Sequence, residues 1–181
     1  MAYKNLQHFI DTLEREGELV RIKEFVDPHL EITEVVDRIS KSNNNKALLF
    51  ENTGTPFPLL INSMGSYKRM CLALGVKELD DISGQIEKLF KQLSSPKENI
   101  LDKIKMLPAL SEIASWMPKV VSGKGECQEV IMSDPDITKF PVMKCWPEDG
   151  GPFITLPVIH TIEPNNGIRN CLLYTSPSPR D

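Results

Sequence analysis

The residues best suited to chemistry lie in one segment, residues 140–157, with the sequence FPVMKCWPEDGGPFITLP. Thr155 offers a small hydroxyl that could bind a phosphate or a polar ring atom, and the glycine pair at 150–151 permits close approach of a ligand to the backbone. Asn170 is expected on a neighbouring strand, so its amide and the Thr155 hydroxyl could face one pocket. A tight loop with a stacking Trp146 explains the same residues about as well, and spacing alone does not choose between the two.

Other reactive side chains are dispersed along the sequence. His8, His29 and His160 form no pair with metal-ligand spacing, so each is interpreted as a surface or packed histidine. The chain contains neither the Gly-x-Ser-x-Gly pattern of a nucleophile nor the Gly-x-Gly-x-x-Gly pattern of a dinucleotide loop. Its four cysteines include no Cys-x-x-Cys pair, which favours free thiols over a disulfide framework or a zinc site.

The N-terminal part of the chain alternates between helical and extended patterns. Caps, breakers and apolar stripes predict helices that begin at Asn5, Asp27-Pro28, Ser66 and about Ile82, and that end near residues 17, 41, 75 and 93. Short apolar runs predict strands over residues 19–25, 47–50 and 59–62. This alternation predicts an N-terminal α/β domain over residues 1–93, within a chain of the α+β class.

The pattern changes after residue 93. Residues 94–118 contain several prolines and are interpreted as a helical connector, with one amphipathic helix over residues 98–106. Extended patterns then dominate, and we expect strand-like pieces over the three ranges 126–132, 140–144 and 153–163. The Asn165-Asn166-Gly167 sequence is a strong hairpin signal, so a returning strand should begin at Ile168.

Composition limits the class of protein. The chain has 181 residues, with 21 Lys and Arg against 25 Asp and Glu, and a formal net charge of −4. Mild acidity without a basic run argues against a nucleic-acid partner. No apolar stretch reaches the roughly 18 residues that span a bilayer. The N-terminus also lacks a signal-peptide pattern, so we expect a cytoplasmic protein.

The last eleven residues, 171–181, do not continue the expected hairpin strand. Such a strand should alternate for about five residues, yet Pro177 and Pro179 would remove hydrogen-bond donors there. The peptide CLLYTSPSPRD is similar over its full length to one reading frame of a transposase adapter used in preparing sequencing libraries. A disordered natural terminus is the alternative. We interpret residues 171–181 as a non-native, adapter-derived tail, with the natural protein continuing after Asn170.

Several segments of the chain resemble one enzyme family. The FPVMKCWPEDGGPFITLP segment, followed by GIRN, resembles the central-domain signature of the UbiD-type decarboxylases, which include the 4-hydroxy-3-polyprenylbenzoate decarboxylase of quinone biosynthesis. The segments LQHFIDTLEREGELVRI, DPHLEITEV and INSMGSYKRMCLALG are similar too, so the resemblance covers residues 6–170. The family pattern continues after the asparagine with Val-Gly-Met-Tyr-Arg, whereas this chain has Cys-Leu-Leu-Tyr-Thr, which supports the adapter interpretation.

The resemblance implies a three-domain enzyme of which this chain is the front portion. Residues 119–170 would begin a central split β-barrel of the flavin-binding type, truncated here, and a later domain would serve oligomerisation. The family's barrel holds prenylated FMN (prFMN), with Mn²⁺ or Mg²⁺ and K⁺ near its phosphate. The implied reaction is the non-oxidative decarboxylation of an aromatic or α,β-unsaturated acid, with the flavin as electron sink and a glutamic acid as proton donor.

Few of the family's functional residues fall on this chain. Asn170 matches the family's metal-ligand asparagine, and its amide oxygen is a hard donor suited to Mn²⁺ or Mg²⁺. Thr155 matches the strand position that contacts the cofactor phosphate region. Pro152 and Ile154 would line the approach to the cofactor. The resemblance therefore implies three cofactor-binding residues and one metal ligand.

No catalytic residue is assigned to this chain. The family's arginine, five residues after the asparagine, falls at Thr175, and the other metal ligands and the acid/base set lie beyond Asp181. Glu148 and Asp149 are interpreted as loop residues, because the family's catalytic acids come from later segments. We therefore expect the 181-residue chain to be inactive on its own.

The resemblance also implies partners. It favours a small-molecule acid substrate from ubiquinone or menaquinone biosynthesis, homo-oligomerisation of the full-length protein, and a flavin prenyltransferase that supplies the cofactor. A polyprenylated substrate would bring peripheral membrane association. Two other classes fit the composition: an FMN-binding split-barrel oxidoreductase that consumes NAD(P)H, and a non-enzymatic binding module built on residues 1–93.

Overall fold

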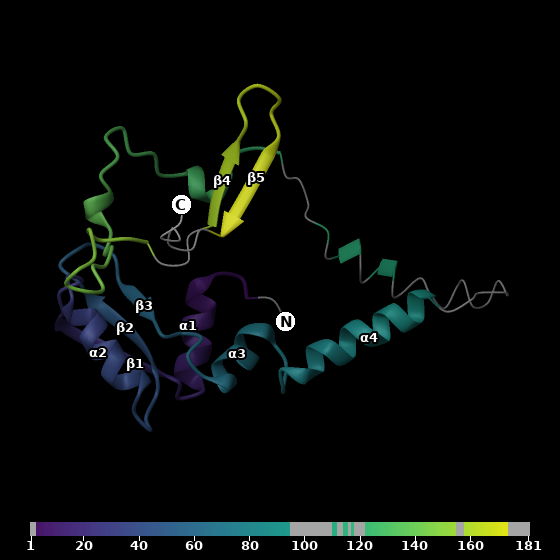
Figure 1. Cartoon of the computed structure of the whole chain (residues 1–181), viewed down its shortest axis with the longest axis horizontal. Helices are drawn as coiled ribbons and strands as arrows, with labels where there is room; N and C mark the ends of the chain where they lie inside the picture. Colours follow the sequence, from purple (N-terminus) through teal and green to yellow (C-terminus); the bar gives the residue numbers. More distant parts are fainter. Residues whose placement is uncertain are drawn as a thin grey trace. The chain divides into compact units, whose positions relative to one another are not determined.

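A computed structural model describes most of the chain and divides it into two compact units. One unit comprises Met1–Gly17 with Met64–Pro135, and the other comprises Glu18–Ser63 with Asp136–Asp181. The residues that the structure describes are 3–94, 110–111, 114–115, 117, 122–154 and 158–173. The elements of each unit are labelled in Figure 1. The predicted connector helix over residues 98–106 lies outside the described residues.

Two short helices of the first unit begin and end at the residues that the sequence predicts. In α1 (Leu6–Arg15), the His8 amide donates to Asn5 Oδ1 at 2.9 Å, and Gly17 follows the helix with φ +66°. In α3 (Tyr67–Leu74), the Arg69 amide donates to Ser66 Oγ, and Gly75 has φ +68°. A side-chain acceptor satisfies an otherwise unpaired amide of the first turn. Glycine takes the left-handed conformation at the other end without a Cβ penalty.

The first unit is held together by contacts between these two helices and by a buried face of α1. Phe9, Ile10 and Leu13 are buried at helical spacing. The Tyr3 hydroxyl donates to Leu72 O at 2.7 Å, and the Tyr3 ring packs edge-on against Phe9. The predicted helix after residue 81 is confirmed as α4 (Asp80–Ser94).

The second unit contains a three-stranded mixed sheet. Strand β1 (Leu19–Phe25) pairs in parallel with β2 (Ala47–Asn52), and β2 pairs antiparallel with β3 (Leu59–Ile61). Helix α2 (Glu31–Ser40) is the crossover between the parallel strands, because parallel neighbours require a long connection. The first four residues of β2 are all buried, as expected for the central strand of a sheet. The predicted N-terminal strands are confirmed.

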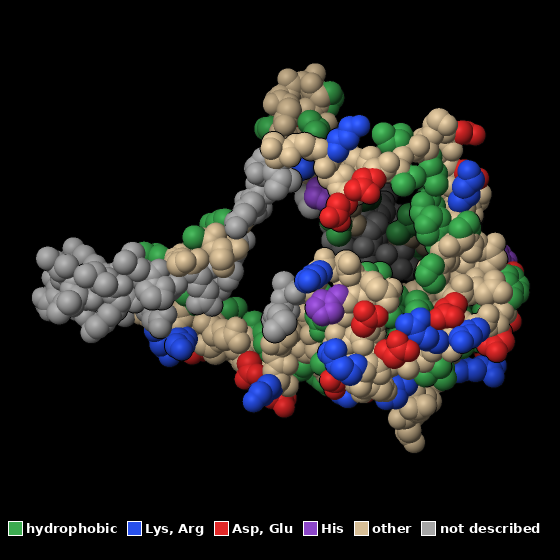
Figure 2. All heavy atoms as spheres, turned by 180° about the vertical axis from the view of Figure 1, so that it is seen from behind, with side chains coloured by type: hydrophobic (Ala, Val, Ile, Leu, Met, Phe, Trp, Pro, Cys, Tyr) green, Lys and Arg blue, Asp and Glu red, His purple; other side chains and the backbone are tan. Residues whose placement is uncertain are grey.

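The core of this unit lies between α2 and the sheet, and a residue from much later in the chain completes it. Val26, Ile32, Leu48 and Phe50 are buried together with Met143. Charged side chains of both signs cover the opposite face of α2, where Arg38 pairs with Glu34 and Lys41 pairs with Asp37. Figure 2 shows Lys and Arg side chains interspersed with Asp and Glu on the face that it presents.

The start of α2 differs from the prediction. The helix begins at Glu31 rather than at Asp27-Pro28, because the preceding residues form a side-chain-bonded turn. Asp27 Oδ1 accepts from the His29 amide, and Glu31 Oε2 accepts from the Asp27 amide, each at 2.8 Å. Leu30 then has φ +74°, which no helical residue adopts. The Asp-Pro signal therefore marks the turn before the helix.

The predicted strand over residues 126–132 is wrong. The structure has a 3-10 turn, η1 (Glu126–Gln128), followed by a bend at residues 129–130, and residues 126–132 pair with no strand among the described residues. Val130 and Ile131 are 82% and 77% exposed. An apolar extended pattern becomes a strand only when another strand supplies its hydrogen bonds, and sequence spacing cannot show that such a partner exists.

The predicted hairpin is confirmed, and no closed barrel is seen in the part of the chain that the structure describes. β4 (Val158–Ile162) pairs antiparallel with β5 (Arg169–Leu173) over five residue pairs. The Gly167 amide donates to Glu163 O, and Gly167 has φ +69°. The expected strand over 153–163 is shorter, because Phe153 makes only an isolated bridge, to Met143, and regular pairing starts at Val158.

Candidate functional site

Asn170, the predicted metal ligand, lies on the hairpin. It is the second residue of β5 and is paired with Thr161 of β4. The side chains of both residues are exposed. The five-pair ladder holds the Asn170 backbone, while the amide oxygen and nitrogen project from the sheet surface. The position therefore offers one hard oxygen donor on an ordered strand.

The predicted cofactor residues Pro152 and Ile154 flank Phe153, whose backbone is attached to the body of the second unit. The Phe153 amide donates to Met143 O at 3.0 Å in an antiparallel bridge. Pro152 and Ile154 are both exposed, Ile154 by 55%. Thr155, the third predicted cofactor residue, lies outside the described residues. The structure thus places two of the three on one segment and leaves the third untested.

The acidic residues between Met143 and Phe153 belong to a tight turn. The Trp146 amide donates to Asp149 Oδ2 at 2.8 Å, and the Asp149 amide donates to Trp146 O at 3.1 Å. The Asp149 carboxylate is therefore engaged by the backbone, as expected of a loop residue. Glu148 is exposed beside it, and the Trp146 side chain is 59% exposed. The tight turn agrees with the interpretation of this segment as a structural loop. The Trp146 side chain, however, is mostly exposed to solvent.

The segment that leads into this turn is anchored at three places. The Phe140 and Phe57 rings stack with centroids 4.8 Å apart. The Met143 side chain is 6% exposed within the core, and the Leu30 amide donates to Lys144 O at 2.9 Å. None of these anchors is predicted from the sequence. The short apolar run at residues 140–143 is the available signal, but it does not identify the partner of the segment.

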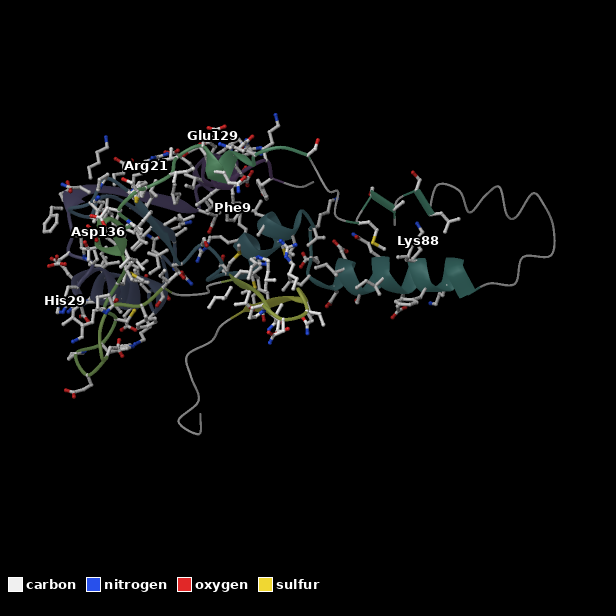
Figure 3. All side chains as sticks on the ribbon, turned by 90° about the horizontal axis from the view of Figure 1, so that it is seen from above. Phe9, Arg21, His29, Lys88, Glu129 and Asp136 are labelled. Carbon is white, nitrogen blue, oxygen red and sulfur yellow. The ribbon has the colours of Figure 1, made fainter. Side chains whose placement is uncertain are left out.

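One carboxyl group near this segment has a shifted pKa. Asp136 precedes the 3-10 turn η2 (Ile137–Lys139) and is labelled in Figure 3. The Thr138 hydroxyl, which donates to Asp136 Oδ1 at 2.6 Å, is the main reason that the pKa of Asp136 lies below its ordinary value of 3.8. The Thr138 amide and the Lys139 charge lower this pKa further. The group stabilises a turn and lies apart from the predicted site residues in the sequence.

The histidines are each accounted for by local structure. The His8 ring packs edge-on against Tyr3, and the His29 backbone bridges to Lys144. His160 lies in β4 opposite Cys171. Among the described residues, no group of three or more His, Cys, Asp or Glu side chains is placed to hold a metal ion.

The helices that the structure describes include none that is both long enough and apolar enough to cross a membrane.

Family models match the chain twice, in chain order. The model of the 3-octaprenyl-4-hydroxybenzoate carboxy-lyase N-terminal domain matches residues 10–89. The model of the Rift-related domain of the same carboxy-lyase matches residues 119–174. The second match includes the first four residues of the predicted adapter-derived tail, 171–174, and the origin of that tail stays a prediction.

The relatives are much longer than this chain. An uncharacterized protein of Aquifex aeolicus is 48% identical over 174 residues, which are 95% of this chain and 35% of that protein. An uncharacterized protein of Archaeoglobus fulgidus is 42% identical, with 96% of this chain and 35% of that protein covered. The chain therefore spans about a third of the length of the curated relatives it matches.

Solved structures share the fold. The closed form of vanillic acid decarboxylase from Sedimentibacter hydroxybenzoicus is 24% identical with a TM-score of 0.66, covering 91% of this chain and 32% of that one. An evolved dimeric form of the UbiD-class enzyme HmfF from Pelotomaculum thermopropionicum, in complex with prFMN, is 24% identical with a TM-score of 0.64. That match covers 93% of this chain and 34% of the other.

Proposed function

Because the chain belongs to the UbiD family of carboxy-lyases, we propose that it is part of a prFMN-dependent enzyme that decarboxylates an aromatic or α,β-unsaturated acid. The observation that carries this proposal is the order of the two family matches, first the N-terminal domain and then the Rift-related domain, along one continuous chain. The fold agrees with that order, since UbiD-class structures superpose on more than nine tenths of the chain.

The proposed organisation follows the sequence. Residues 1–93 form an N-terminal α/β domain, residues 94–118 a helical connector, and residues 119–170 the beginning of a split β-barrel that later strands complete. Support comes from the hairpin β4–β5, whose exposed apolar side chains include Val158 and Ile162 at 60% and 68%. A two-stranded sheet is marginally stable by itself, so such a hairpin fits a larger sheet or barrel.

The donor chemistry of the site fits the proposed metal and cofactor. Asn170 supplies an amide oxygen for Mn²⁺ or Mg²⁺, which prefer oxygen ligands, with K⁺ as a further cation near the cofactor phosphate. Pro152, Ile154 and Thr155 would line the cofactor. When bound, prFMN supplies the electron sink for the departing CO₂. The residues of this chain would bind and orient the metal ion and the cofactor. None of them is assigned the proton transfer, so the 181-residue chain alone is proposed to be inactive.

The substrate and partners are proposed at the level of the family. The matching models carry the name of a polyprenyl-hydroxybenzoate carboxy-lyase, which favours a quinone precursor as substrate. Such a substrate would bring the enzyme to a membrane surface from the cytoplasm. We also propose homo-oligomerisation of the full-length protein and a flavin prenyltransferase as the source of the cofactor.

The experiment compares the 181-residue chain with the protein completed from its source gene, each supplied with prFMN and Mn²⁺. We expect CO₂ release from an aromatic or unsaturated acid by the completed protein alone. CO₂ release by the short chain would overturn its proposed inactivity. Turnover of the completed protein with unmodified FMN and NAD(P)H, without CO₂ release, would favour an oxidoreductase. Absence of flavin binding would favour a binding module.

A further inference from the structure

We propose that Met143 is a positioning residue: its side chain lies in the core of the N-terminal sheet while its backbone holds the segment that carries Pro152 and Ile154. The inference rests on the proposed function, because it takes these two residues as part of the cofactor site. The N-terminal module would then set the geometry of that site.

The first step is the burial of the Met143 side chain. It is 6% exposed and belongs to the same buried cluster as Ile32 of α2 and Leu48 and Phe50 of β2. Protein cores are close-packed, so a side chain in such a cluster is held in place by all its neighbours. The Met143 backbone is therefore fixed relative to α2 and the sheet, although it lies more than ninety residues further along the chain than Phe50.

The second step is the backbone bridge. Met143 O accepts the Phe153 amide at 3.0 Å, and the two residues form an antiparallel bridge. Pro152 has no amide hydrogen, so the Phe153 amide is the first donor after the glycine pair that can attach this segment to its neighbour. Pro152 and Ile154 are covalently bonded to Phe153. A shift of Met143 must therefore be passed to both of them.

The third step is that the attachment is reinforced on both sides of Met143. The Leu30 amide donates to Lys144 O, and Leu30 adopts φ +74°, a conformation that bulky side chains rarely take. Such strain persists only where surrounding contacts over-determine it. On the other side, Phe140, which lies three residues before Met143, stacks on Phe57. Anchors at 140, 143 and 144 leave the segment little freedom to shift against the sheet.

The test uses the gene-completed protein in three main forms: wild type, M143A and M143L. M143A removes the buried side chain, and M143L keeps its volume. The matched control is L13A, a truncation of similar size at a fully buried residue of α1 in the other unit. M143V, which retains more of the side chain, replaces M143A if the latter does not fold. Two quantities are measured: the flavin dissociation constant by fluorescence, and hydrogen exchange of the Phe153 amide.

We expect M143A to weaken flavin binding at least tenfold and to speed hydrogen exchange of the Phe153 amide. M143L should keep the wild-type values of both quantities, and L13A should change neither. A wild-type flavin affinity in M143A would overturn the inference. An equal loss of flavin affinity in M143A and L13A would also overturn it, because the loss would then reflect reduced stability alone. Failure of the proposed function is recognised separately: the wild-type protein would then bind no flavin, and the inference would fall with it.

Discussion

At the scale of single residues, three aspartates of the described chain hold turns together. The carboxylates of Asp27, Asp136 and Asp149 accept the amides of His29, Thr138 and Trp146, at 2.8, 2.9 and 2.8 Å. In each case the carboxylate stabilises a local turn by accepting a backbone amide. The Asp149 carboxylate is therefore explained by its role in the turn at 146–149.

The Asp136 turn gives a prediction about pH. Its folded-state pKa lies below the ordinary value of 3.8, so the turn contributes stability above that pH and loses it as pH falls through the lowered pKa. T138V removes the hydroxyl donor, which is the largest cause, and should raise the pKa of Asp136 towards 3.8, as measured by NMR titration of the carboxyl carbon. K139A should move it less, because the Lys139 charge is a smaller cause. A larger shift in K139A than in T138V would contradict this account.

Asn170 gives a second residue-scale prediction, on the gene-completed protein. If its amide oxygen is a Mn²⁺ ligand, N170A should weaken Mn²⁺ binding by about tenfold or more, which corresponds to roughly 1.4 kcal/mol. The affinity is measured by electron paramagnetic resonance of free Mn²⁺. The control is T161A, because Thr161 is the cross-strand partner of Asn170 in the hairpin. Equal losses in both variants would assign the effect to the hairpin rather than to the amide.

At the scale of elements, the features that sequence could predict are those set by neighbours in the chain. The Asn5 and Ser66 caps and the Asn165-Asn166-Gly167 turn act over a few residues, and the structure confirms the elements that they bound. The strand expected over 126–132 failed because strand formation needs a distant partner. Met143 was missed for the same reason, since no local pattern announces that it packs against α2 and β2.

Gly17 and Gly84 of the first unit test whether local backbone conformation sets the effect of a substitution, because both have open space around the Cα atom. A Cβ added at Gly17 or at Gly84 would meet nothing within 4 Å, so their substitutions differ only in backbone conformation. Gly17 has φ +66°, and G17A should destabilise the unit by about 1 kcal/mol. Gly84 lies inside α4, and G84A should stabilise that helix by about 0.5–1 kcal/mol. Chemical denaturation, followed by far-ultraviolet circular dichroism, measures the change in the free energy of unfolding of each variant. Changes of the same sign in G17A and G84A would refute the explanation by backbone conformation.

At the scale of the whole molecule, much apolar surface on the second unit has no cover in the described residues. Ile159, Ile162 and Ile168 are 41%, 68% and 64% exposed on and beside the hairpin. Both faces of a two-stranded sheet are open, and its edges carry unpaired backbone groups. The relatives are about three times as long as this chain, and a further segment of that length would be long enough to cover this surface.

Concentration-dependent self-association through the open hairpin is therefore expected of the 181-residue chain, whereas the gene-completed protein should form only its proposed homo-oligomer of defined size. Size-exclusion chromatography with light scattering measures the difference over a range of concentrations. I162K in the short chain should reduce the association, because a charge at an exposed strand position opposes edge-to-edge pairing and removes no buried contact. The control is L74K, at a 55% exposed position of α3 outside the hairpin. If L74K is as effective as I162K, general solubility rather than hairpin pairing explains the change.

The remaining prediction concerns the gene itself. β5 runs through Leu173, so the three residues after Asn170 pair with β4 whatever their origin, and pairing alone does not distinguish native sequence from adapter. The second family match ends at residue 174, two residues before the Ser-Pro repeat begins at Ser176. We expect the source gene to diverge from this sequence after codon 170 and to encode further alternating strands. Amplification and sequencing of untreated genomic DNA measure this; a native reading frame ending in CLLYTSPSPRD would refute the adapter interpretation and, with it, the expectation of a longer natural chain at this point.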